Sequence, residues 1–172
     1  MFAIVQNNEI VKTGGSIRTL FPNISFPAGG ASAQFKADNG VMEVVSGEQK
    51  DQRFYWVTPA NPSLQLVDGV PTRVYTNTPK ALEDVTETPE GQEEEVITIG
   101  LKTQWIAQTK ENANKALAPT DWYVIRKAER DVAIPAEVVA ERQAIIDACT
   151  AKEAAITAAT TIEGLMTAVQ GA

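Results

Sequence analysis

The chain has 172 residues, enough for one domain or two small ones, and 44% of them are hydrophobic, which suffices for a buried core. It has no histidine and a single cysteine, Cys149. This composition excludes an intrachain disulfide, the histidine-based catalytic arrangements and nearly all zinc sites. The net charge of −7 and the absence of a basic stripe argue against nucleic-acid binding.

Residues 1–82 show strand patterns and predict an antiparallel β domain. Asn7-Asn8 and Asp68-Gly69 are typical of two-residue hairpin turns, and Pro71 should lie on an edge strand or among the first residues of its strand. The irregular stretch 14–40 could be pinned to a sheet by its aromatic residues. The predicted strands cover residues 2–6, 9–13, 41–46, 53–58, 63–67 and 70–76.

The segment 83–95 carries seven carboxylates and no basic residue. We interpret it as a solvated loop or linker. A calcium site is the alternative, although the spacing of the acids does not match that of a calcium-binding loop. Residues 96–99 predict one further strand.

From Gly100 onward the apolar residues follow a helical period. A first helix should end at Ala118-Pro119, and Thr120 or Asp121 should cap a second helix up to residue 131, although Tyr123–Ile125 would also suit a strand. The apolar face of the first helix comprises Leu101, Trp105, Ile106, Ala113 and Leu117.

Pro135 is expected as the first residue of a longer helix. Its apolar face comprises Val138, Ile145, Cys149 and Ile156. The sequence Thr160–Glu163 fits a capping box for a last helix, whose apolar residues are Ile162, Leu165, Met166 and Val169. Together these patterns predict an α+β fold: a β-rich domain over 1–82, an acidic loop over 83–95 and a mainly helical region over 96–172.

The helix that begins at Pro135 has apolar or small residues on more than one face. One face should pack on the helices at 101–130, while a second meets another subunit or a partner. Arg142 and Lys152 interrupt the repeat, so a long isolated coiled coil is not expected. We expect residues 135–170 to carry the main oligomeric or docking contact, for example in a threefold or sixfold assembly. The alternative is a compact monomer whose β domain covers both faces.

The segment 117–142 combines several residues that can fix the angle between helices. Trp122 is expected to be a buried anchor between the neighbouring helices, or alternatively a surface residue that recognises a partner. Arg126 and Arg142 could form ion pairs with Asp121 or with two acids that follow, Glu129 and Asp131.

This segment, LAPTDWYVIRKAERDVAIPAEVVAER, resembles a module of proteins encoded near the tail-fibre genes of tailed bacteriophages. In that module a helix ends in leucine, Thr-Asp-Trp follows, and an arginine, a proline and a second arginine come later. The matching residues are Leu117, Thr120, Asp121, Trp122, Arg126, Pro135 and Arg142. The acidic segment 83–95 is an addition to the pattern.

The resemblance implies a non-enzymatic structural component of a phage tail: a fibre, baseplate or adaptor protein of the virion, made in the host cytoplasm. A tail-fibre assembly chaperone that is not retained in the virion is the alternative. The partners would be other tail proteins and further copies of the chain, without a cofactor, a metal, nucleic acid or membrane insertion. A glycan hydrolase would need two carboxylates across a cleft, roughly 5–9 Å apart, and no motif in the sequence indicates one.

Overall fold

The computed structural model describes residues 1–88 and 96–171. The chain divides into two compact units, Met1–Thr78 and Pro79–Ala172. The first unit holds two small β-sheets and two short helices, while the second holds a two-stranded ribbon and the long helices. The α+β class is therefore confirmed. The boundary between the units in the sequence follows Thr78, four residues before the predicted end of the β domain at residue 82.

The first sheet of unit 1 joins β1 (Phe2–Gln6), β2 (Glu9–Gly14) and β3 (Val41–Glu43) in the order β2-β1-β3, with antiparallel pairing throughout. Asn7 and Asn8 have φ of 51° and 61°, so they form the predicted tight turn. Behind this sheet lies a small core of Ile4, Leu20 and Val41, with Phe2, Ile17 and Phe21 packed against it.

The prediction that 14–40 is irregular is wrong for two stretches, α1 (Ile17–Leu20) and α2 (Ala33–Asp38). Each is capped by a serine, since Ser16 and Ser32 accept hydrogen bonds from backbone amides three residues later. Of the aromatic residues expected to pin this stretch to a sheet, Phe21 packs against the core of the first sheet. The ring of Phe35 meets those of Phe21 and Phe26 edge-on, with centroids 5.1 Å apart in both pairs.

The second sheet contains β4 (Val45–Ser46), β5 (Tyr55–Val67) and β6 (Val70–Pro79) in the order β4-β6-β5. The predicted strand 41–46 is thus divided between two sheets, while the predicted strands 53–58 and 63–67 form one. β5 lies at an edge of this sheet. An edge strand tolerates proline, because its outward-facing amides need no partner in the sheet. The sequence predicted antiparallel pairing throughout this domain, but β4 and β6 pair in parallel. Pro71, the second residue of β6, is buried.

Unit 2 begins with an antiparallel ribbon of β7 (Val85–Glu87) and β8 (Val96–Thr98), in which Val85 pairs with Thr98. The first part of the predicted acidic loop is therefore a strand. The residues directly before this strand, 81–84, are also in contact with the fold, because they accept hydrogen bonds from the first amides of the helix that follows the ribbon. The rest of that prediction, residues 89–95, lies outside the described residues.

The helices of unit 2 are α3 (Leu101–Leu117), a 3-10 turn η1 (Ala118–Thr120), α4 (Asp121–Arg130), α5 (Ala136–Ala158) and α6 (Ile162–Gln170). Residues 123–125 are thus helical. Two predicted helix starts are off by one residue. Pro135, expected as the first residue of α5, is its N-cap. Thr161 rather than Thr160 caps α6, and its hydroxyl accepts from the Gly164 amide at 3.0 Å.

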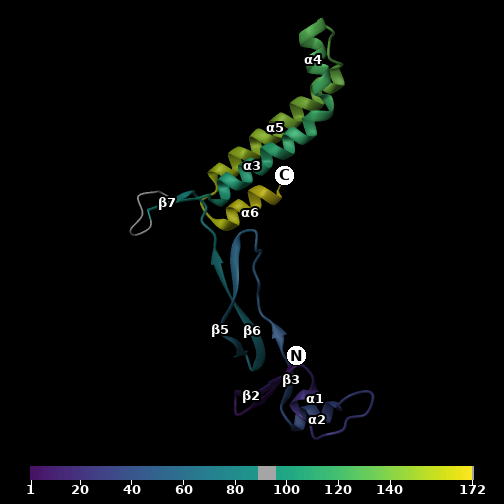
Figure 1. Ribbon diagram of the computed structural model, residues 1–172, viewed down its shortest axis with the longest axis vertical. Coiled ribbons are helices and arrows are strands. Elements are labelled where there is room, and N and C mark those ends of the chain that lie inside the picture. The colour runs from purple at the N-terminus through teal and green to yellow at the C-terminus, as the bar shows by residue number, and fades with distance from the viewer. Residues whose placement is uncertain (89–95, 172) are drawn as a thin grey trace. The chain divides into compact units, whose positions relative to one another are not determined.

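Within unit 2, α3 and α5 run side by side as a helical hairpin (Figure 1). α4 lies at the turn of this hairpin, while β7 and α6 lie at its opposite end. The buried core gathers at that opposite end and consists of Leu101, Ile156, Ala159, Ile162 and Leu165. The apolar period of α5 is confirmed, since Val138, Ile145 and Cys149 are half-buried and Ile156 is fully buried. Thr109 is a buried polar residue of α3, and its hydroxyl donates to the Trp105 carbonyl at 2.8 Å.

The start of α3 is held by backbone and side-chain acceptors from the segment before β7. The amides of Leu101 and Lys102 donate to the carbonyls of Ala81 and Leu82, at 2.9 and 3.0 Å. The Gly100 amide donates to Asp84 Oδ1 at 2.7 Å. These contacts satisfy amide groups that a helix leaves without partners at its first turn. Across the described residues, no helix has the length and apolar character to cross a bilayer.

Candidate interaction surface on the helical hairpin

Arg142 ties the turn of the helical hairpin together. Its Nη1 donates to the Leu117 carbonyl at 3.0 Å, to Thr120 Oγ1 at 2.7 Å and to Asp121 Oδ1 at 2.9 Å. Thr120 Oγ1 in turn donates to the Leu117 carbonyl at 2.9 Å. One side chain of α5 thereby contacts the last carbonyl of α3 and the first residue of α4.

This contact explains the spacing of the 117–142 motif in physical terms. Four of its seven residues, Leu117, Thr120, Asp121 and Arg142, meet in one hydrogen-bonded network. The predicted pairing of Arg142 with Asp121 is confirmed. Thr120 lies at the expected cap position of α4, but its hydroxyl bonds to Leu117 and Arg142 rather than to an amide of α4.

The prediction that Trp122 is buried is wrong. Its side chain remains 49% exposed, because α4 lies at the turn of the hairpin, away from the buried core at the opposite end. The indole lies against the ring of Tyr123, with centroids 3.9 Å apart. The Arg126 guanidinium lies over both rings, 4.7 Å from the Trp122 centroid and 5.4 Å from that of Tyr123. These three residues form a cation–π stack on the surface of α4.

Arg126 does not form the ion pair that we predicted from the sequence. Asp131 pairs instead with Lys127, at 2.5 Å. Among the described residues, no carboxylate lies within 4.0 Å of the Arg126 guanidinium, and its buried Nε has no acceptor. In the part of the chain that the structure describes, the guanidinium contacts the two rings, and its Nε donor is left without a hydrogen bond.

Exposed apolar side chains lie near this stack, among charged residues of the same helix. Val124 and Ile125 of α4 are 42% and 56% exposed, and Val132 of the following loop is 41% exposed. Trp122, Ile125 and Arg126 share one side of α4, because residues three and four apart are neighbours on a helix. We call Trp122, Tyr123, Ile125 and Arg126 the tip surface.

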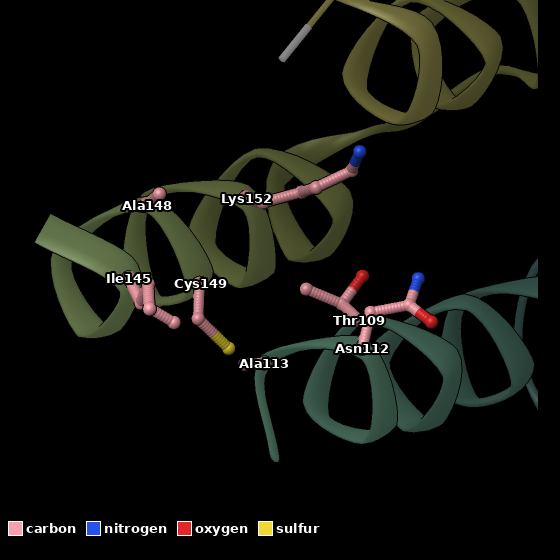
Figure 2. Close-up of a pocket in the computed structure, with 7 residues that line it drawn as sticks. All are labelled: Thr109, Asn112, Ala113, Ile145, Ala148, Cys149 and Lys152. Atoms are coloured by element: carbon pink, nitrogen blue, oxygen red, sulfur yellow. The ribbon is translucent and has the colours of Figure 1, made fainter. Parts of the chain in front are cut away.

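A second apolar area lies on α5, where Val139 and Ile146 are 51% and 43% exposed and stand seven residues apart. Two shallow pockets lie between α3 and α5. Both are lined by Ala113 and Cys149, whose small side chains leave space between the helices. One has a volume of about 270 Å³ (Figure 2). The other has about 280 Å³, and Ile146 lines it. The residues drawn around the first pocket are Thr109, Asn112, Ala113, Ile145, Ala148, Cys149 and Lys152.

Cys149 belongs to a short polar chain across this seam. Its Sγ donates to Glu153 Oε1 at 3.2 Å, and Glu153 Oε2 lies 3.2 Å from Lys110 Nζ. Removal from water and the bonded carboxylate of Glu153 raise the pKa of the Cys149 thiol. The hydrogen bond from Cys149, with the contact to Lys110, lowers the pKa of Glu153. The thiol is therefore held in its protonated form.

The groups at the hairpin turn are suited to non-covalent contact: aromatic and aliphatic side chains beside an unsatisfied guanidinium. In the described part of the chain, no three metal-binding side chains lie together. The sequence pattern located the 117–142 motif and left surface exposure of Trp122 as the alternative to burial, and the structure has the side chain 49% exposed. Comparison with family models, curated proteins and solved structures finds no match to this chain.

Proposed function

We propose that this chain is a non-enzymatic structural component of a bacteriophage tail, acting through protein–protein contacts within the virion. The observation that carries the proposal is the exposed Trp122 on a helix whose start is bonded to Arg142. The Arg142 network holds α4 in place, while the indole stays 49% exposed. A rigid helix that presents aromatic and arginine side chains is typical of the energetic centre of a protein interface.

The 117–142 resemblance supplies the link to phage tails, and the structure gives its residues two roles. Leu117, Thr120, Asp121 and Arg142 build the turn, whereas Trp122 is exposed and the Arg126 guanidinium lies over its ring. A motif with only a structural role would have no reason to combine an exposed tryptophan with an unpaired arginine. Contact with another tail protein supplies that reason.

Quantitative mass spectrometry of purified phage particles tests the proposal. A tail component should be present in a fixed ratio to the other tail proteins, in copies that match a threefold or sixfold symmetric assembly. Its absence from particles, together with its presence on free fibres in the lysate, would instead identify a tail-fibre assembly chaperone. Absence from both particles and fibres would reject both functions.

The exposed face of α5 is the second part of the proposal, and we assign to it the docking onto a different tail protein. Val139→Ser and Ile146→Ser should reduce incorporation into particles without unfolding the chain. Val11→Ser is the matched control, because Val11 of unit 1 is 54% exposed and lies outside this face. Normal incorporation of the double variant would show that α5 is not the docking face.

A further inference from the structure

We propose that α5 pairs antiparallel with α5 of a second copy of this chain, so that two helical hairpins form a dimer with twofold symmetry. The contact is made by six residues on the side of α5 that borders the first pocket. We call them the pairing stripe; they are Val138, Glu141, Ile145, Ala148, Lys152 and Ala155. The proposal does not depend on the tail assignment, because it rests on the residues of α5 and its groove alone.

The pairing stripe borders an unfilled groove of the helical hairpin. Ile145, Ala148 and Lys152 line one wall of the first pocket, of about 270 Å³, and α3 forms the opposite wall (Figure 2). Ala148 is exposed and Ile145 is half-buried. Two helices form a single layer, and apolar residues beside their seam are removed from water only when another element covers them. The groove therefore has room for a further helix.

The spacing of the pairing stripe is that of a helix that packs along another helix. From Val138 to Ala155 its residues follow one another at intervals of three, four, three, four and three positions. These intervals keep the side chains on one side of α5 over about 25 Å. Lys152, which interrupts the apolar repeat, is thus a regular member of the stripe.

Antiparallel pairing combines a large with a small side chain in every apolar layer. When the twofold axis passes midway along the stripe, Val138 faces Ala155 of the second copy, and Ile145 faces Ala148. The symmetry repeats both contacts, which gives four filled layers. Parallel pairing would instead place two isoleucines in one layer and two alanines in the next, so that one layer is crowded and the other is empty.

The two charged residues of the stripe favour the same orientation. In the antiparallel pair, Glu141 faces Lys152 of the second copy. Among the residues that the structure describes, neither side chain has an ion-pair partner within 4.0 Å. They cannot meet within one copy, because 11 positions of the same helix separate them by about 16 Å. Parallel pairing would bring like charges together in both layers. The charges of the stripe are therefore complementary to a second, antiparallel copy.

Sedimentation equilibrium of the full chain tests the proposal. The wild-type protein should sediment as a dimer. Glu141→Lys places a lysine opposite Lys152 in both charged layers and should weaken dimerisation at least ~10-fold. Combining Glu141→Lys with Lys152→Glu should restore the dimer, because opposite charges face each other again with their places exchanged. In a parallel dimer this exchange would restore nothing, since like charges would still meet.

Two results would overturn the proposal. One is a wild-type protein that stays monomeric at about 200 µM. The other is a double variant that associates no more tightly than Glu141→Lys alone. Circular dichroism of each variant verifies that it folds.

Three matched controls separate this contact from general effects of charge or hydrophobicity. Asp147→Lys makes the same change of charge as Glu141→Lys on an exposed position of α5 outside the stripe. Ile146→Ser removes an exposed apolar side chain beside the second pocket, and Arg126→Gln alters the tip surface. All three should sediment as the wild-type protein does. Loss of the dimer in Ile146→Ser but not in Glu141→Lys would place the interface on the other side of α5 and contradict the proposal.

Discussion

Arg142 and Asp121, 21 residues apart in the sequence, are joined by a contact of 2.9 Å from Nη1 to Oδ1. The Arg142 side chain is 17% exposed, whereas that of Asp121 is 54% exposed. The same Nη1 also bonds the half-buried Thr120 hydroxyl and Leu117 carbonyl. The ion pair is thus the solvent-facing part of a network whose inner part consists of hydrogen bonds.

This asymmetry predicts unequal effects of removing the two partners. Arg142→Ala should lower the free energy of unfolding by about 2–3 kcal/mol, because it leaves shielded acceptors without a donor. Asp121→Asn should lower it by less than about 1 kcal/mol, since exposed ion pairs contribute little. Urea denaturation measures both, with Gln143→Ala as the control on an exposed neighbour. Equal losses for the two variants would mean that the ion pair dominates.

Trp122→Ala should lower the free energy of unfolding by no more than about 1 kcal/mol, because half of the side chain is in water. Leu165→Ala, which removes a fully buried side chain of α6, should lower it by about 2–5 kcal/mol. Thermal or urea denaturation of the two variants makes the comparison. If Trp122→Ala destabilised the chain as much as Leu165→Ala, the tryptophan would be an anchor of the fold rather than a surface residue.

Gly100→Ala should destabilise unit 2 strongly. Its φ of −72° suits any residue, but an added Cβ would lie 2.3 Å from the Glu83 carbonyl carbon and oxygen. Relief requires the chain to move apart at the three hydrogen bonds that close the start of α3. Gly29→Ala is the control, since an added Cβ there meets nothing within 4 Å. A loss of several degrees in Tm for Gly100→Ala alone would agree with this account, and equal Tm values for the two variants would contradict it.

The raised pKa of Cys149 predicts slow alkylation of its thiol, because the thiolate is the reactive form. The pH at which iodoacetamide reacts at half its maximal rate should lie above that of the unfolded chain. Glu153→Gln should move this midpoint to lower pH, since the bonded carboxylate is one of the causes of the shift. Glu153→Asp retains the charge and serves as the control. The protonated thiol favours folding at neutral pH, and this contribution is lost as the pH rises through the raised pKa.

The sequence alone determined the local elements whose cause lies within a few neighbouring residues. Asn7-Asn8 and Asp68-Gly69 form turns because their backbones accept positive φ. The apolar period that ends at Ile156 set the packed face of α5, because one face of a helix must be removed from water. The pairing of Arg142 with Asp121 was also predictable, since an opposite charge was available near each end of the motif.

The tertiary structure decided what depends on distant partners. Residues 85–87 form a strand only because 96–98 lie beside them, and the parallel pairing of β4 with β6 follows from contacts that no local pattern records. Trp122 was expected inside and lies half outside, because burial depends on where α4 is held and not on the size of the side chain. That position is set by three hydrogen bonds from Arg142, a residue more than five helical turns away in the sequence.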